Sequence, residues 1–134
     1  MDVAELDRLL SLEYSDDYWS DEAVVYLRES VEQMSNAEFQ GLRSVWRQRP
    51  QTWQQRLAEV LSRAPAEGAF ILGEMLESSD EETAIAAAES LNSLEAFPSE
   101  IVSERARAWL LELAERSPLN KMTVDELMEK IEPR

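Results

Sequence analysis

The stretch from residue 68 to residue 94 constrains the fold more than any other part of the chain. Its sequence is GAFILGEMLESSDEETAIAAAESLNSL, an apolar run followed by a Ser-Ser-Asp turn and an alanine-rich amphipathic run. This is the pattern of one helix-turn-helix unit, which cannot bury its apolar face alone and needs stacked neighbours. Such a chain is more typical of a partner-binding scaffold than of an enzyme.

Length and composition indicate a single domain covering residues 1–134. A chain of 134 residues has ordinary domain size and can bury roughly two-thirds of the surface that its unfolded form exposes. Apolar residues make up 44% of the chain, which argues against wholesale disorder despite the high charge. With three glycines and five prolines, the composition favours helices joined by short connections.

The N-terminus and the apolar runs predict a cytoplasmic protein that does not bind membranes. The first residues, MDVAELDRLL, are acidic and have no basic region before an apolar core, unlike a signal peptide. No apolar run approaches the roughly 18 residues of a membrane span. Cysteine is absent, which is compatible with the cytosol and leaves neither a disulfide framework nor a thiolate metal site.

Apolar residues recur at helical spacing along the chain, and no segment has a convincing strand pattern. We therefore predict an all-α fold of seven or eight short helices, with antiparallel neighbours because the connections are short. The helices pair into units at about 37–63, 66–95 and 98–131, which is close to the period of helical repeats.

Local signals predict where several helices begin and end. Pro98 is expected to open a long helix, which Ser117 and Pro118 close. Three pairs have capping-box spacing, in which each side chain can satisfy a free backbone N–H at the start of a helix. They are Ser35 with Glu38, Ser79 with Glu82, and Thr123 with Glu126.

Residues 72–94 resemble a HEAT repeat. A first helix leads into LESSDEE, and a second has the sequence TAIAAAESLNSL, with small residues where helices pack closely. The chain departs from the family at Thr83 and Ala84, where a basic residue often follows the acidic turn. The best repeat-like unit is 66–95, and the resemblance implies a HEAT-like stack. An irregular helical bundle remains the alternative architecture, since both bury the same apolar stripes.

The net charge of −15 is unevenly distributed along the chain. Residues 1–35 carry ten acids and two arginines, and residues 64–100 carry nine acids and no basic residue. Residues 43–63, in contrast, carry five arginines and one acid. An acidic surface repels phosphates and anionic lipid and attracts basic partners, so we expect a basic protein partner and no direct contact with nucleic acid. Solubility alone explains the excess of acids equally well.

The residue types give little support for catalysis. Histidine is absent, which excludes imidazole acid–base chemistry, histidine-containing triads and histidine metal ligands. Gly68 and Gly73 have phosphate-loop spacing, but Glu74 and Met75 follow where Lys and Ser or Thr are needed. Carboxylates are so numerous that a pair suited to a glycosidase is expected by chance. We predict no enzyme activity, no cofactor and no metal site.

Two acidic segments are candidate binding surfaces. Residues 13–22, EYSDDYWSDE, mix aromatic residues, which can anchor a partner, with carboxylates that can pair with its Lys or Arg. In the competing structural interpretation, the aromatic residues of this segment attach the first helix to the core and the acids are solvated. The second segment is the acidic turn near residue 80, whose acids the helix dipole also explains. The predicted partner-binding residues are Asp16, Asp17, Tyr18, Trp19, Asp21, Glu22, Asp80 and Glu81.

Trp46 and Trp53 flank an arginine-rich segment that could stack bases or hold an anion. Both tryptophans nevertheless continue apolar stripes at helical spacing, so we expect them in the core. The arginines of residues 43–63 are then expected to pair with the surrounding acids.

In size, charge and style, the chain resembles the immunity proteins of bacterial toxin systems, some of which have HEAT-like folds. This resemblance implies an inhibitor that occludes a basic toxin, such as a nuclease whose groove binds phosphates. The alternative is an adaptor that holds a peptide or protein between its stacked helices. An enzyme or nucleic-acid binder that uses residues 43–63 ranks last. The sequence does not indicate an oligomeric state.

Overall fold

A computed structural model describes residues 1–132, and within them the fold is all-α. Eight helices are longer than one turn, and no strand occurs in this part of the chain. They are α1 (Val3–Ser11), α3 (Val24–Glu32), α4 (Asn36–Val45), α5 (Gln51–Val60), α6 (Ala66–Met75), α7 (Glu81–Ser93), α8 (Glu104–Ala114) and α9 (Pro118–Ile131). Shorter turns are α2 (Asp16–Tyr18), a π-helical turn (Trp19–Ala23) and three 3₁₀ turns (Trp46–Gln48, Leu61–Arg63 and Ser99–Ile101).

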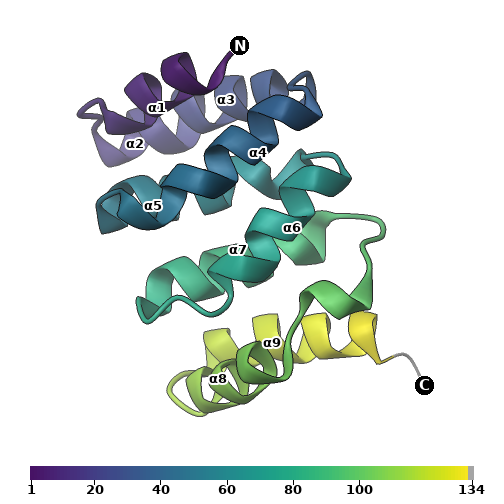
Figure 1. The fold of residues 1–134 in the computed structure, drawn as a ribbon. Helices are drawn as coiled ribbons and strands as arrows, with labels where there is room; N and C mark the ends of the chain where they lie inside the picture. The colour runs from purple at the N-terminus through teal and green to yellow at the C-terminus, as the bar shows by residue number, and fades with distance from the viewer. Residues whose placement is uncertain (133–134) are drawn as a thin grey trace.

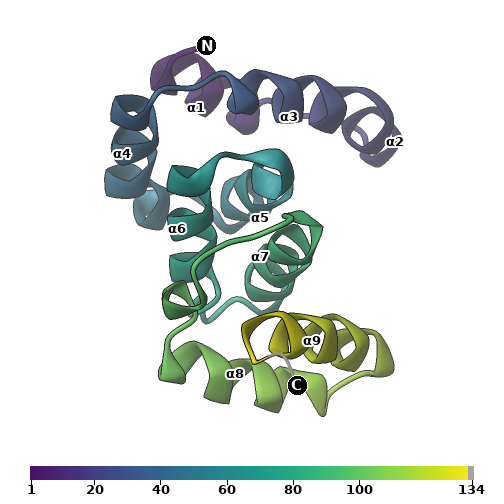
Figure 2. The same ribbon diagram turned by 90° about the vertical axis from the view of Figure 1, so that its right-hand side faces the viewer.

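The helices are arranged in pairs that follow one another from the N-terminus to the C-terminus (Figure 1). Helices α3, α5, α7 and α9 contact one another in sequence and form one layer, with α1, α4 and α6 packed beside it (Figure 2). We call α3, α5, α7 and α9 the second layer. The helix-turn-helix predicted from residues 68–94 is confirmed as α6 and α7, which pack against each other.

The core lies between the helices as one continuous cluster that extends from Leu6 in α1 to Ile131 in α9. Trp46 and Trp53 belong to it with 4% and 2% of their surfaces exposed, as their spacing predicts. Small residues in α6 and α7 let neighbouring segments approach these helices closely. A Cβ added to Gly73 of α6 would lie 2.6 Å from the backbone oxygen of Ile101, so the connection before α8 can cross there only over a glycine.

One predicted helix start is confirmed and another moves by one residue. The hydroxyl of Ser35 accepts a hydrogen bond from the backbone N–H of Glu38 at the start of α4. The prediction that Ser79 caps α7 is wrong, because Asp80 does so. The Asp80 carboxylate accepts hydrogen bonds from both the backbone N–H and the hydroxyl of Thr83, at 3.1 and 2.6 Å. The hydroxyl of Ser79, one residue earlier, makes neither of these bonds.

The last two helices also begin elsewhere than predicted. Pro98 precedes a 3₁₀ turn rather than a long helix, and α8 begins after Ser103, whose hydroxyl accepts the N–H of Ala106. Ser117 likewise caps α9, with Pro118 in the first position, where the missing N–H costs nothing. The helix then continues through Thr123, so the predicted cap at that residue is wrong.

Candidate protein-binding surface

The acidic and aromatic residues 13–22, which we call the α2 segment, form the connection between α1 and α3. Ser15 caps the single turn of α2 by accepting the N–H of Tyr18 at 3.1 Å. The π-helical turn follows, and its wider loop is closed by a hydrogen bond from the N–H of Val24 to the carbonyl of Trp19. Such turns occur mostly as single-turn bulges inside α-helices, frequently at functional sites.

The aromatic side chains of this segment gather around one arginine. Tyr14 stacks on Tyr18, with ring centroids 5.7 Å apart, and lies 5.6 Å from the ring of Trp19. The guanidinium of Arg56 in α5 lies 5.0 Å from the centre of the Tyr14 ring and 5.1 Å from that of Trp19. Partial burial raises the pKa of Tyr14, whose hydroxyl donates to the carbonyl of Leu9. The connection is therefore held to α5 by its aromatic residues.

Trp19 is attached to the core, whereas its neighbours face solvent. Its indole N–H donates to the side-chain carboxylate of Glu59, forty residues away in α5, and its ring packs partly buried against the core. This geometry matches the structural interpretation of Trp19. Tyr18 is 54% exposed. The four acids around them are exposed, and no ion pair within residues 1–132 involves them; they are Asp16, Asp17, Asp21 and Glu22.

The other two predicted residues, Asp80 and Glu81, have structural contacts in a different place. Gln55 donates to the Asp80 carboxylate at 2.9 Å, and Asn120 donates to that of Glu81 at 3.0 Å. Burial of the Asp80 carboxyl opposes its ionisation, but its hydrogen bonds from Thr83 and Gln55 outweigh this and lower its pKa. No hydrogen bond or ion pair in the described chain joins either acid to the α2 segment.

Two further acids, which the sequence did not single out, extend the acidic surface across the second layer. Glu59 of α5 accepts the indole N–H of Trp19 and lies close enough to Glu89 of α7 to affect its titration. Partial desolvation and the negative charge of Glu59 both raise the pKa of the Glu89 carboxyl. The sequence could have indicated that Glu89 is on the surface. It lies two helical turns after Glu82, on the side of α7 away from the buried Ala84.

Most basic side chains form ion pairs or hydrogen bonds with other groups of the same chain. Every described lysine and arginine except Arg8 contacts an acid or a backbone carbonyl. The ion pairs are Arg43–Glu74, Arg47–Glu74, Arg49–Asp7, Arg63–Glu32, Arg105–Glu77, Arg107–Glu132, Arg116–Glu112 and Lys121–Asp125. Carbonyls are bound by Arg28, Arg56 and Lys130. The prediction that the arginines of residues 43–63 pair with nearby acids is confirmed for all but Arg56.

Arg56 shows what these contacts do for the surface. Its guanidinium donates to the carbonyls of Leu10 and Leu12, at 3.0 and 2.7 Å, just where α1 ends. It thus satisfies free carbonyls at a helix C-terminus while supporting the aromatic rings above it. A hollow of about 430 Å³ opens beside this arginine, between the end of α1 and the start of α5, and is lined in part by Glu13 and Tyr14.

Neither a metal site nor a membrane span is found in the described part of the chain. Residues 1–132 contain no group of three or more His, Cys, Asp or Glu side chains arranged to hold a metal ion. None of their helices combines the length and the apolar character that crossing a bilayer requires. In comparisons with known proteins, no family model, no curated protein and no solved structure matches this chain.

Proposed function

We propose that this protein is a non-catalytic, cytoplasmic inhibitor that binds a basic partner protein through its acidic and aromatic surface. The partner is a toxin domain, and a nuclease fits best because its substrate groove must be basic to bind phosphates. The inhibitor then occupies that groove directly, in the manner of a HEAT-like immunity protein. The contact surface is the α2 segment with its exposed acids, continued by Glu59.

One observation carries this proposal: every described lysine and arginine except Arg8 contacts an acid or a carbonyl of the same chain, whereas the acids of the α2 segment form no ion pair within residues 1–132. Asp16, Asp17, Asp21 and Glu22 are exposed without an ion-pair partner among residues 1–132. Their charge is therefore available to a partner, and it steers a basic protein toward this end of the molecule. The exposed ring of Tyr18 adds apolar contact area, and its rigid side chain loses little conformational entropy on binding.

The same observation disfavours nucleic-acid binding by residues 43–63. Arg43 and Arg47 bind Glu74, and Arg49 binds Asp7, so a phosphate would have to displace these carboxylates. No comparable observation favours an adaptor that holds a peptide through apolar contacts alone. The affinity of such an adaptor would change little with salt, whereas the proposed contact weakens as salt rises.

The test begins with capture of the partner from native lysate at physiological salt and its identification by mass spectrometry. The affinity of the purified partner is then measured by calorimetry for the wild-type protein and for the double variant Asp16→Lys, Asp17→Lys. We expect the variant to bind at least about tenfold more weakly, since close charge pairs in interfaces couple by well over 1 kcal/mol. If the partner is a nuclease, one equivalent of inhibitor should abolish its activity.

A charge-matched control separates a local contact from the effect of net charge. The double variant Glu115→Lys, Glu129→Lys makes the same change in net charge with two exposed residues, one just after α8 and one on α9. Equal weakening by both variants would show that only net charge matters. Unchanged affinity in the Asp16 and Asp17 variant would remove the α2 segment as the binding site.

A further inference from the structure

Helix α9 exposes the two least covered large apolar side chains of the described chain. Leu119 is 76% exposed and Met122 is 69% exposed, and they lie one helical turn apart on the same side of the helix. Beside Met122, a hollow of about 330 Å³ opens between α7 and α9. It is lined by Glu89, Asn92, Ser93, Met122, Thr123 and Glu126. The second layer therefore combines an uncovered apolar patch with a depression.

The charged side chains that line this hollow are both acidic. Glu89 of α7 and Glu126 of α9 line it, Glu59 lies near Glu89, and no ion pair within residues 1–132 involves any of the three. Helix α9 also carries two lysines, neither of which lines the hollow: Lys121 pairs with Asp125, and Lys130 donates to the carbonyls of Asn92, at the edge of the hollow, and Leu94. A group that fills the hollow and supplies positive charge would thus meet both the apolar patch and the carboxylates.

We propose that the hollow between α7 and α9 binds a basic amphipathic helix. An apolar side chain of that helix packs on Leu119 and Met122, while lysine or arginine side chains one turn away contact Glu89 and Glu126. A helix suits this place because such a partner presents apolar anchors at intervals of three and four residues. Strand addition needs an exposed sheet edge, and the described chain contains no strand. The inference rests on the proposed function only in requiring a basic partner.

The experiment uses a synthetic 14-residue peptide with leucine and lysine at helical spacing, titrated into the ¹⁵N-labelled full-length protein at physiological salt. We expect the amide signals of residues 89–93 and 119–126 to shift most. A peptide of the same length with serine in place of every leucine should bind much more weakly, because it lacks the apolar anchor. Shifts spread over all acidic segments, or equal binding of both peptides, would show charge attraction alone and overturn the inference.

Variants separate this site from the α2 segment. Met122→Ser should weaken peptide binding about fivefold or more, as expected of an interface anchor, and Glu89→Gln should weaken it as well. The control is Leu111→Ser, which changes an apolar side chain of α8 that is 56% exposed and does not line the hollow. All three residues are exposed, so thermal unfolding should confirm intact folds.

Two outcomes would overturn this site and leave the proposed function standing. The first is that the peptide shifts only the signals of residues 13–22. The second is that the partner binds the Asp16 and Asp17 variant more weakly but binds the Met122 and Glu89 variants as tightly as wild type.

Discussion

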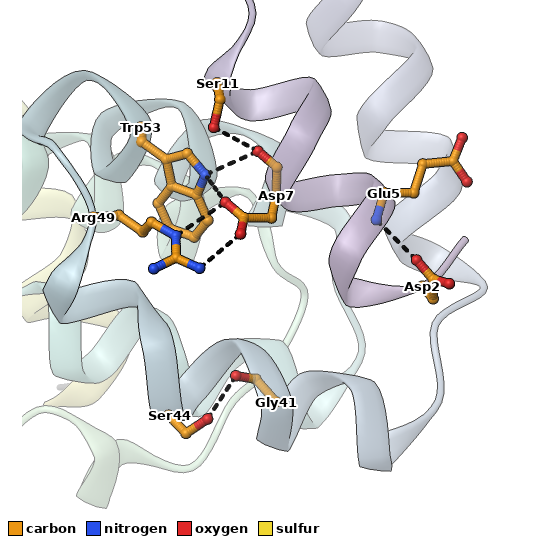
Figure 3. Close-up of polar contacts among 8 residues, drawn as sticks. All are labelled: Asp2, Glu5, Asp7, Ser11, Gly41, Ser44, Arg49 and Trp53. Carbon is orange, nitrogen blue, oxygen red and sulfur yellow. Dashed lines mark hydrogen bonds and ion pairs between the residues drawn. The ribbon is translucent and has the colours of Figure 1, made fainter.

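Arg49 donates two hydrogen bonds to the carboxylate of Asp7, from Nε at 3.0 Å and from Nη2 at 2.6 Å, and thereby joins the start of α5 to α1 (Figure 3). The indole N–H of Trp53 donates to the same carboxylate at 3.0 Å. The hydrogen bonds from Arg49 are the main reason that the pKa of Asp7 lies below its usual value. The first helix is thus attached to the stack by an ionised acid.

This lowered pKa predicts that stability falls in acid. Asp7 binds protons less tightly in the folded state than in the unfolded state, so its contribution is complete above the ordinary pKa of about 4. It is lost as the pH falls further, through the folded-state value. We expect Asp7→Asn to lower the free energy of unfolding by about 1–2 kcal/mol at pH 7 and by less at pH 3, measured in urea. Asp125→Asn, at an exposed pair with Lys121, should differ little from wild type. An Asp7 variant with an unchanged pH dependence would contradict this role.

Asp80→Ala should destabilise the protein although Asp80 is one of the residues predicted to bind the partner. The substitution removes the N-cap of α7 and the hydrogen bond from Gln55, at a cost of about 1–2 kcal/mol. Ser79→Ala is the matched control, because Ser79 is exposed and does not cap the helix, and this substitution should change stability by less than about 0.5 kcal/mol. Urea unfolding of both variants measures the difference. A larger loss in the Ser79 variant would restore the capping box that the sequence predicted.

Gly73→Ala should destabilise the protein by about 1–3 kcal/mol, because the new methyl group would press on the backbone of Ile101. Gly41→Ala makes the same change in α4, where the nearest atom is a side-chain methyl of Val3 at 3.1 Å that can move. Since alanine favours helices over glycine by up to about 1 kcal/mol, the Gly41 variant should be neutral or more stable. Thermal unfolding compares the two. Equal melting temperatures would mean that the connection before α8 yields easily.

Glu89→Gln should make the protein slightly more stable at pH 7. The raised pKa of Glu89 means that the folded state binds this proton more tightly than the unfolded state, so ionisation on going from acid to neutral pH disfavours folding. Glutamine removes that cost, by less than about 1 kcal/mol because solvent screens an exposed carboxylate. The gain should vanish near pH 4, where the carboxyl is largely protonated. Glu115→Gln is the control, and a gain that is equal in both variants would reflect net charge alone.

The fold class followed from periodicity, but several helix boundaries did not. Apolar spacing is a property of many residues at once, so it predicted the α6–α7 hairpin and the buried tryptophans. A cap depends on one residue, and near residue 80 both Ser79 and Asp80 have suitable side chains. Asp80 accepts both the N–H and the hydroxyl of Thr83, and Gln55, which comes from another helix, donates a further hydrogen bond to it that the local sequence does not reveal.

The candidate surface was predictable only in part, for a related reason. The exposed acids of the α2 segment are visible in the sequence as a local cluster. The bond between Trp19 and Glu59 spans forty residues, and the neighbourhood of Glu59 and Glu89 arises only when α5 packs on α7. The π-helical turn Trp19–Ala23 likewise has no signal in the sequence.

The internal engagement of the cations has a consequence for the kinetics of association. All described lysines and arginines except Arg8 are held by carboxylates or carbonyls of the same chain, so the surface offers few free positive charges to other acidic proteins. It repels such proteins over roughly a Debye length of 8 Å. A basic protein, by contrast, is attracted, so encounters with it are fast at low salt and slow steeply as salt rises. In the complex that we propose, the lifetime is then set separately, by the aromatic and apolar contacts that salt does not screen.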